Sequence, residues 1–204
     1  SEHCIECGLC YDVCDRGAIR REDAAEEIRL TVDCIVVATG YQQFDPADKP
    51  VLGYLRLPDV VTSLEFERMI NAGGPTGGRL RRLSDGKPPG SVVFVQCVGS
   101  RDATIGRSWC SGTCCMAAIK HAILIKEKHP ECEVTICYID IRAYGKGYEE
   151  YYQRAERLGV RFLRGMPAEV VEGRDGMVLC VENTENRQFL ELHPDLVVLS
   201  IGVG

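Results

Sequence analysis

The residues best suited to chemistry in this chain are its cysteines, which occur 12 times among 204 residues. Eight of them form two groups, one with the spacing C-x2-C-x2-C-x3-C and one with the spacing C-x12-C-x3-C-C. Clustered thiols in a chain that shows no export signal indicate metal binding rather than disulfides. The first group is Cys4, Cys7, Cys10 and Cys14, and the second is Cys97, Cys110, Cys114 and Cys115.

The first group lies in CIECGLCYDVC and has the spacing of one half of a bacterial ferredoxin, which predicts a [4Fe–4S] site. Two-residue gaps wrap a tight loop around three corners of a cluster, and Gly8 gives that loop room to turn. In two-cluster ferredoxins the fourth cysteine ligates the other cluster, so Cys14 would need an upstream motif that this chain lacks. Asp15 also replaces the usual proline. We therefore expect an incomplete ferredoxin site, with zinc or structural thiols as the alternative.

The second group surrounds the junction between an apolar run, SVVFV, and a helical pattern. Cys97 falls at the carboxyl end of the expected strand, where open α/β sheets place their ligand sites. Cys114 and Cys115 fall in the first turn of the expected helix, after Ser111 and Thr113 as candidate caps. Because a helix N-terminus lowers thiol pKa values and favours anions, the junction is suited to a negatively charged metal–sulfur cluster.

Nearby arginines, Arg101 and Arg107, add positive charge to this junction. We expect the four thiols of the second group to hold one [4Fe–4S] cluster without outside help. A four-cysteine zinc site uses the same ligands, and buried cysteines also pack as small apolar residues or act as redox thiols. The remaining cysteines stand alone in or beside expected strands and are predicted to be core or surface thiols: Cys34, Cys132, Cys137 and Cys180.

The elements that position these thiols follow a strand–helix–strand–helix–strand order from residue 91 onward. Continuous apolar strands in this order predict an α/β fold with a parallel sheet covered on both faces. Three short strand-like pieces before the last strand predict an inserted β-meander. The expected strands are 91–96, 133–140, 160–165 and 195–202, the helices are 114–128 and 149–159, and the meander pieces are 168–173, 176–183 and 188–193.

The first 90 residues are less regular. TVDCIVVATGY predicts a buried strand that ends at Gly40, and Thr62 with Glu65 forms a capping box for a helix that continues to Ala72, before Gly73. GGPTGG and SDGKPPG predict turns or linkers. The expected division is a partial ferredoxin segment over 1–30, a strand, helix and Pro/Gly-rich linker over 31–90, and an α/β domain over 91–204.

Composition limits the classes of partner. The formal net charge is −6, which argues against nucleic acid because no basic surplus exists to neutralise phosphates. No apolar run approaches 18 residues, so no membrane span is expected. The free thiols favour a reducing, cytoplasmic location. The chain begins almost inside a motif, at SEHCIECGLC, as expected of a piece of a longer protein.

The chain resembles the A subunit of heterodisulfide reductase and its relatives, which are iron–sulfur flavoproteins of anaerobic metabolism. The resemblance covers nearly the whole chain and rests on CIECGLCYDVCDRGAI, IVVATGY, TSLEFERMI, GPTGG, QCVGSRD, CSGTCCMAAIKHA, YIDIRAYGKGYEEYYQRA, GVRFLRG and DLVVLSIG. It implies a thioredoxin-reductase-like flavin module with an inserted ferredoxin segment. It also implies that the C-x12-C-x3-C-C pattern holds a [4Fe–4S] cluster.

The same resemblance implies the partners and the reaction. The family moves electrons between a hydrogenase or formate dehydrogenase, ferredoxin and a disulfide-reducing subunit of the same complex, in some cases by flavin-based bifurcation. The flavin-binding Gly-rich fingerprint is absent, and the chain ends before the family's flavin domain resumes. We therefore expect a middle segment in which IVVATGY is the last flavin-domain strand. FAD would belong to the intact parent, and this segment alone would be neither a flavin binder nor an active enzyme.

Two other functions compete with electron relay. The order of elements fits the pyridine-nucleotide domain of a disulfide reductase, in which Arg142 would meet a 2′-phosphate. Against this, Gly99 stands alone without a G-x-G-x-x-G pattern, so a pyrophosphate cannot approach the backbone. Arg142 and Lys146 then form a solvated or partner-facing edge.

The third candidate is a docking module with structural cysteines, in which tyrosines of the helix over 149–159 face a partner or simply pack as an amphipathic helix. The tyrosines concerned are Tyr148, Tyr151 and Tyr152. No acid–base pair or nucleophile–histidine arrangement is evident, because the four histidines are scattered. They are His3, His121, His129 and His193.

Overall fold

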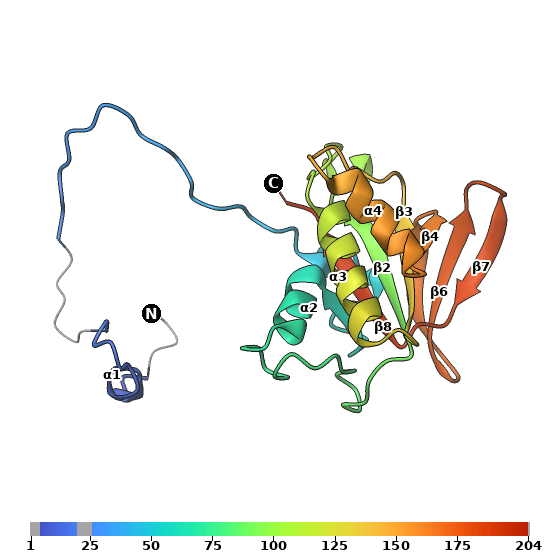
Figure 1. The fold of residues 1–204 in the computed structure, drawn as a ribbon, viewed down its shortest axis with the longest axis horizontal. Coiled ribbons are helices and arrows are strands. Elements are labelled where there is room, and N and C mark those ends of the chain that lie inside the picture. The colour runs from blue at the N-terminus through green and yellow to red at the C-terminus, as the bar shows by residue number, and fades with distance from the viewer. Residues whose placement is uncertain (1–4, 20–25, 204) are drawn as a thin grey trace. The chain divides into compact units, whose positions relative to one another are not determined.

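The computed structural model describes residues 5–19 and 26–203 (Figure 1). The chain divides into two compact units, residues 1–39 and residues 40–204. In the described residues of the first unit the one helix is α1 (Leu9–Asp12), which begins after Gly8. All strands of the described residues belong to the second unit, which therefore contains the body of the fold.

A five-stranded parallel sheet forms the centre of the second unit, in the order β1-β8-β2-β3-β4. Its two middle strands, β2 and β8, are apolar along almost their whole length and are buried on both faces, which is what a parallel sheet requires. The strands are β1 (Val60–Thr62), β2 (Ser91–Val98), β3 (Glu133–Tyr138), β4 (Arg161–Arg164) and β8 (Leu196–Ile201).

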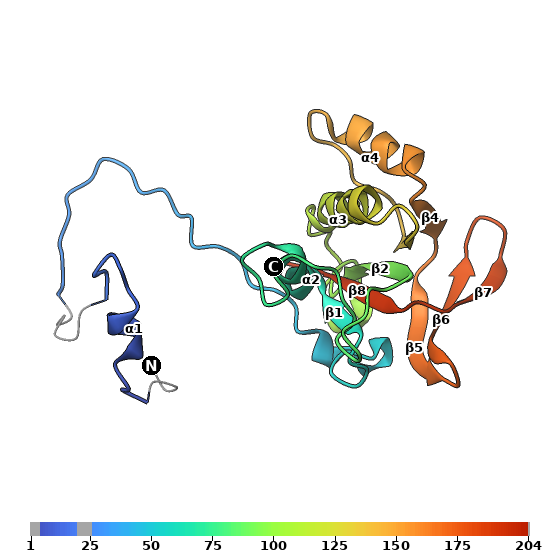
Figure 2. The same cartoon turned by 60° about the horizontal axis from the view of Figure 1, so that its bottom comes forward.

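Helices cover one face of this sheet. α3 crosses β2 and β8 in Figure 1, and α4 packs beside α3 in Figure 2. The core between helices and sheet includes Phe66 from α2, Phe94 from β2 and Ile119 from α3, all fully buried. The helices are α2 (Ser63–Ile70), α3 (Cys114–Lys128) and α4 (Tyr148–Arg157).

A three-stranded antiparallel sheet, in the order β5-β6-β7, covers part of the opposite face. Val170 and Leu179 of this meander join Val95 and Leu199 of the main sheet in a second core. Phe44 and other residues of the segment before β1 complete that core. The meander strands are β5 (Pro167–Gly173), β6 (Gly176–Asn183) and β7 (Gln188–Leu192).

The structure confirms the predicted α/β class, with its doubly covered parallel sheet and inserted meander. α3 has the bounds that the sequence predicts. The predicted capping box is also present: Thr62 Oγ1 accepts a hydrogen bond from the Glu65 amide at 3.2 Å, and the Glu65 carboxylate accepts one from the Thr62 amide at 2.7 Å. α2 ends at Ile70, two residues earlier than expected.

One strand was missed and one predicted strand is absent. β1 was not expected, and the buried strand expected over 31–41 does not form. Ile35, Val36 and Val37 are exposed, at 77%, 85% and 78%. No described strand pairs with them, and an extended segment without a ladder partner is not stable as a strand. The proposed division into ferredoxin, flavin-domain and nucleotide-binding-like parts stays a prediction.

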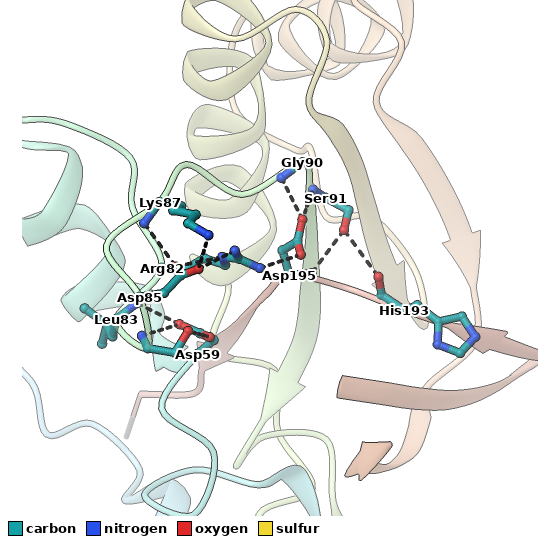
Figure 3. Close-up of polar contacts among 10 residues, drawn as sticks. Asp59, Arg82, Leu83, Asp85, Lys87, Gly90, Ser91, His193 and Asp195 are labelled. Atoms are coloured by element: carbon teal, nitrogen blue, oxygen red, sulfur yellow. Dashed lines mark hydrogen bonds and ion pairs between the residues drawn. The ribbon is translucent and has the colours of Figure 1, made fainter. Parts of the chain in front are cut away.

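The amino ends of the sheet strands are fastened to the Pro/Gly-rich loop that precedes β2 (Figure 3). Asp59 accepts hydrogen bonds from the amides of Leu83 and Ser84, at 2.7 and 3.1 Å, and from the Ser84 hydroxyl. Asp195 accepts one from the Gly90 amide at 2.7 Å and forms an ion pair with Arg82 at 3.0 Å. The loop itself satisfies the hydrogen-bonding capacity of these carboxylates. We therefore assign the amino ends of the strands a structural role.

Within the described residues, none of the helices is long and apolar enough to cross a bilayer.

Candidate functional site

The site begins at an irregularity in the central strand. The pairing of β2 with β8 shifts register between Val95 and Val98, and Cys97 within that bulge has φ 57°. A left-handed conformation is costly for a residue with a Cβ, and bulges of this kind redirect a side chain. The side chain of Cys97 is 5% exposed and meets the first turn of α3. The bulge therefore turns one strand residue toward the helix N-terminus.

The adjacent cysteines of α3 complete a row of thiols. Cys114 and Cys115 are 5% and 3% exposed. Cys114 is in side-chain contact with both Cys97 and Cys115, and the single proton of the Cys115 thiol is donated to the Asp140 carbonyl oxygen. Three of the four predicted ligands are thus in direct contact. Thr113 is the N-cap residue of α3, as the sequence predicts, but its side chain makes no capping hydrogen bond.

Contact and burial shift the pKa values of these thiols in different directions. The hydrogen bond from Cys114 lowers the pKa of Cys97, against the effect of burial, and the charge of Arg101 contributes further. Contact with Cys115 lowers the pKa of Cys114, but contact with Cys97 and burial outweigh this and raise the pKa to about 11. Contact with Cys114 and burial raise the pKa of Cys115 as well. The pKa values of both α3 cysteines are raised although they lie in the first turn of the helix, contrary to expectation, because their contacts with neighbouring thiols and their burial favour the neutral form.

The fourth thiol reaches the site on the loop before α3. Cys110 is partly exposed, and its sulfur accepts a hydrogen bond from the Gly112 amide at 3.4 Å. Between them, the Ser111 hydroxyl accepts a hydrogen bond from the Val203 amide at 2.8 Å, which fastens the loop beyond the end of β8. Cys110 is close enough to Cys97 for its charge to oppose ionisation there. The four cysteines of the second group therefore lie together at the carboxyl ends of the sheet strands.

Charged groups surround this end of the sheet. Arg101 binds Asp140 with 2.5 Å between Nη1 and Oδ1, and Arg142 binds the same carboxylate oxygen through Nε at 3.1 Å. Burial opposes the charge of Asp140, but the hydrogen bonds from Arg142 and Arg101 outweigh it and lower the pKa of Asp140. The Cys115 sulfur lies 3.7 Å from the Asp140 carbonyl oxygen. Two guanidinium groups are thus held beside the thiols.

Sequence reasoning missed Asp140, although it follows β3 at the carboxyl edge where ligand sites occur. Arg142 is exposed, as predicted for a solvated or partner-facing edge, and the charges of Cys110 and Cys115 also act on it. The guanidinium of Arg107, the other arginine predicted near this junction, lies over the rings of Phe44 and Trp109, at 5.2 and 6.0 Å from their centroids.

The donor set fits an iron–sulfur cluster. Within residues 5–19 and 26–203, no group of three or more His, Cys, Asp or Glu side chains is arranged around a single metal ion. A [4Fe–4S] cluster is larger than an ion, and its four cysteine thiolates bind separate iron atoms. Three buried thiols, a fourth on a neighbouring loop and two adjacent guanidinium groups supply the four sulfur ligands and the positive charge that such a group requires.

The first cysteine group lies in the other unit. Cys4 is outside the described residues; Cys7 and Cys10 are exposed, and Cys14 is partly exposed. The Cys14 sulfur accepts a hydrogen bond from the Ala18 amide at 3.3 Å, and this bond lowers the pKa of Cys14. Backbone amides directed at sulfur are typical of ferredoxin loops, but whether these cysteines hold a cluster stays a prediction.

The four single cysteines have the environments expected of core or surface thiols. Cys132 and Cys137 are buried, Cys180 is partly exposed and Cys34 is exposed. Burial raises the pKa of Cys132 to about 11 and that of Cys137 to about 12, so both are neutral thiols at pH 7.

Comparison with known proteins agrees with the cysteine patterns. The 4Fe-4S binding domain family matches residues 1–20. The iron–sulfur A subunit of the CoB–CoM heterodisulfide reductase of Methanocaldococcus jannaschii is 53% identical over 206 residues, which cover 100% of this chain and 31% of that protein. The A subunit of the H2:CoB–CoM heterodisulfide,ferredoxin reductase of Methanothermobacter marburgensis is 50% identical, over 99% of this chain and 31% of that protein.

A third relative, the A subunit of the ferredoxin/F420H2-dependent CoB–CoM heterodisulfide reductase of Methanosarcina acetivorans, is 50% identical over 98% of this chain and 26% of its own length. Among solved structures, L-lysine 6-monooxygenase from Pseudomonas syringae aligns with a TM-score of 0.47 at 11% identity, over 79% of this chain and 43% of that chain. The chain spans about a third or less of the curated relatives named here. By its sequence, it belongs to the family of heterodisulfide reductase A subunits, of which it represents one segment.

Proposed function

We propose that this chain is an electron-transfer segment of a heterodisulfide-reductase-like iron–sulfur flavoprotein, and that the cysteines of its second group hold one [4Fe–4S] cluster. The observation that carries the proposal is the convergence of Cys97 with Cys114 and Cys115 at the carboxyl edge of the sheet. Cys110 supplies the fourth thiolate. When bound, the cluster supplies a one-electron redox centre.

The residues of the chain have distinct tasks at this centre. The bulge and the first turn of α3 hold three sulfurs in place, and burial excludes water from them. Arg101 and Arg142 offset the negative charge that four thiolates and a cluster bring together. Their ion pairs with Asp140 fix the guanidinium groups in position. Loading with iron releases the protons of Cys114 and Cys115, because only thiolates ligate the metal.

The loop between β2 and α3 favours a cluster over a dinucleotide. It extends over residues 99–113, whereas a dinucleotide fold joins strand and helix by a tight glycine turn that brings pyrophosphate to the helix N-terminus. Its glycine after the bulge, Gly99, has φ 76° and lies against the ring of Phe44. The glycine is thus required for packing, and the space beside it is filled by an aromatic ring.

Residues 1–20 extend the proposal to a second site. Cys4, Cys7 and Cys10 would belong to a ferredoxin cluster, with Cys14 serving its neighbour, and the match to the 4Fe-4S binding domain family supports this. In the intact parent, FAD would convert between one- and two-electron steps. The relatives' names include ferredoxin, H2 and formate, so we propose ferredoxin, a hydrogenase or formate dehydrogenase and the heterodisulfide-reducing subunits as partners, in the cytoplasm.

The test is the iron content of a Cys114→Ser variant purified without oxygen. We expect the wild-type chain to carry iron and sulfide with absorption near 400 nm, and the variant to lose about four iron atoms per chain, the content of one cluster. Cys132→Ser is the matched control, because Cys132 is equally buried but lies alone. Circular dichroism would verify that both variants are folded. Unchanged iron in folded Cys114→Ser protein, or zinc in place of iron, would refute the assignment.

A further inference from the structure

The main sheet contains buried polar side chains that have no partner. Among the described residues, the amide nitrogen and oxygen of Gln96 and the hydroxyls of Ser100 and Ser200 are buried without a hydrogen bond. Gln96 is 0% exposed, and each serine is 1% exposed. Burying an amide or hydroxyl without a partner costs on the order of 1–3 kcal/mol. Such a group in a native protein therefore requires an explanation.

Gln96 and Ser200 are neighbours on the helix-covered face of the sheet. Side chains alternate along a strand, and Phe94 and Val198, two residues before each, belong to the core beneath α3. The register pairs Val95 with Leu199 and Val98 with Ile201, so Gln96 and Ser200 both fall between these two pairs, at the bulge. Both are near the carboxyl ends of their strands, beneath the N-terminal end of α3.

The same end of the sheet holds the four thiols. Gln96 directly precedes Cys97, whose contact with Cys114 places the first turn of α3 at the end of β2. Ser200 precedes Val203 by three residues, and Val203 is bonded to Ser111 beside Cys110. The unpaired amide of Gln96 on β2 and the unpaired hydroxyl of Ser200 on β8 are therefore close in sequence to residues of the second cysteine site or of its loop.

The opposite end of the sheet gives a contrast. There the buried carboxylate of Asp59 accepts three hydrogen bonds from the loop it holds, as Figure 3 shows. The chain thus satisfies buried polar groups where their role is structural. Of the described side chains with unsatisfied buried atoms, Gln96, Ser100 and Ser200 lie where a cofactor is proposed to bind, and His121 lies further along α3.

We propose that the Gln96 amide and the Ser200 hydroxyl donate hydrogen bonds to sulfur atoms of the cluster held by the second cysteine group, and that these bonds raise its reduction potential. This inference rests on the proposed function. A reduced cluster carries one more negative charge than an oxidised one, so N–H and O–H donors stabilise the reduced form more strongly. Hydrogen bonds to the sulfurs are among the factors that set the potentials of iron–sulfur proteins.

The test is a potentiometric titration of the full chain, reconstituted without oxygen from ferrous iron and sulfide and followed by electron paramagnetic resonance. Gln96→Met keeps the length of the side chain and removes its donors, and Ser200→Ala removes the hydroxyl. We expect the ratio of reduced to oxidised cluster at a fixed potential to fall about tenfold in Gln96→Met, which is about 59 mV for one electron. Ser200→Ala should shift the ratio in the same direction by a smaller factor.

Thr135→Val is the matched control. It removes a hydroxyl that is 9% exposed on β3, on the face opposite its neighbours Val134 and Ile136, which pack beneath the helices. The ratio should not change in this variant. Variants of Gln96 and Ser200 that keep their iron and the wild-type ratio would overturn the inference, and so would an equal shift in Thr135→Val.

A second measurement needs no substitution. Wild-type chain labelled with 15N at its glutamine side chains should show a magnetic coupling between that nitrogen and the reduced cluster, and the absence of a coupling would overturn the inference even if Gln96→Met cannot hold iron. A wild-type chain that binds no iron would instead refute the proposed function itself. The two failures are therefore distinguishable.

Discussion

Gly99 decides whether the loop after β2 can form. A Cβ at this position would lie 2.0 Å from Cγ and 2.4 Å from Cβ of Phe44, and φ is 76°. Phe44 is part of the core shared with the meander, so its ring has little room to move. The position therefore excludes every residue except glycine, for a steric and a conformational reason together.

We expect Gly99→Ala to lower the free energy of unfolding by about 3 kcal/mol, as overpacking and a left-handed alanine add. Gly106→Ala is the control, because Gly106 has a similar φ of 72° but nothing within 4 Å of the added methyl group. That variant should lose only about 1 kcal/mol. Urea unfolding measures both, and equal losses would show that contact with Phe44 is unimportant.

Asp102 and Lys49 provide a pH-dependent contact. The two form an ion pair with 2.5 Å between Lys49 Nζ and Asp102 Oδ2. The hydrogen bonds from Lys49 and from the Thr104 hydroxyl lower the pKa of Asp102 to about 2. Because this pKa is below that of the unfolded chain, the contact stabilises the fold above about pH 4 and ceases to do so as the pH falls through about 2.

Lys49→Met should therefore be less stable than wild type at pH 7, by about 1 kcal/mol, and the difference should shrink between pH 4 and pH 2. The free energy of unfolding, measured across this range, tests the expectation. Lys146→Met is the control, since Lys146 is exposed and the structure shows it in no ion pair with a described residue. A difference for Lys49→Met that is independent of pH would contradict the expectation.

At the scale of elements, sequence reasoning succeeded where a pattern was long and local. α3 and the capping box of α2 were predicted because helical periodicity and cap chemistry lie within a few neighbouring residues. β1 was missed because three residues carry no periodicity, and its strand character comes from pairing with β8. The apolar run Ile35–Val37 has strong β propensity, yet propensity alone cannot supply a neighbouring strand.

The same limit applies to the candidate site. The number and spacing of the cysteines predicted a shared cluster, because the metal ligands can be recognised from the residue type alone. The bulge at Cys97 and the contacts of Asp140 depend on how strands pair and where loops return, which no local pattern encodes. The pKa values of the α3 thiols are raised, where lowering was expected, in part because the thiols are buried, and burial also follows from the tertiary fold.

The loop before β2 offers a test of an element. Asp195 holds this loop by accepting from the amides of Gly90 and Ser91 and by pairing with Arg82. Asp195→Ala should lower the free energy of unfolding by about 2 kcal/mol, because two strand-end amides lose their acceptor and Arg82 keeps only Asp85 as a carboxylate partner. Asp195→Asn should lose less, since an amide oxygen still accepts from the backbone.

Thermal unfolding of the two variants beside Glu169→Ala, an exposed carboxylate of β5, would check this order. Iron content should be the same in all three, as the substitutions lie away from the thiol-bearing edge. A loss in Asp195→Ala no larger than that in Glu169→Ala would argue against the role given to this carboxylate.

At the scale of the molecule, the division at residues 39 and 40 separates the two cysteine groups. The second unit contains both cores, all described strands and the whole second group. In chain order, the first described pairing within this unit is the isolated bridge between Gln43 and Val203, just beyond the end of β8. It therefore has the interactions that an independently folding body requires.

We expect a chain of residues 40–204 to unfold cooperatively, within a few degrees of the temperature of the full chain, and to keep the iron of the second cysteine group. Calorimetry and iron analysis of the two chains test this expectation together. A truncated chain without a cooperative transition would show that residues 1–39 contribute to the stability of the α/β body.

The bulge at Cys97 has a consequence for the speed of electron exchange. The strand on either side of it stays paired, through Val95 with Leu199 and Val98 with Ile201, so the backbone that carries this sulfur is anchored at two points. A sulfur anchored in this way would move little when the charge of a bound cluster changes. Electron transfer to or from the cluster would then require little reorganisation energy. The bulge that interrupts the regular pairing of β2 at Cys97 would thus favour rapid electron transfer at this site.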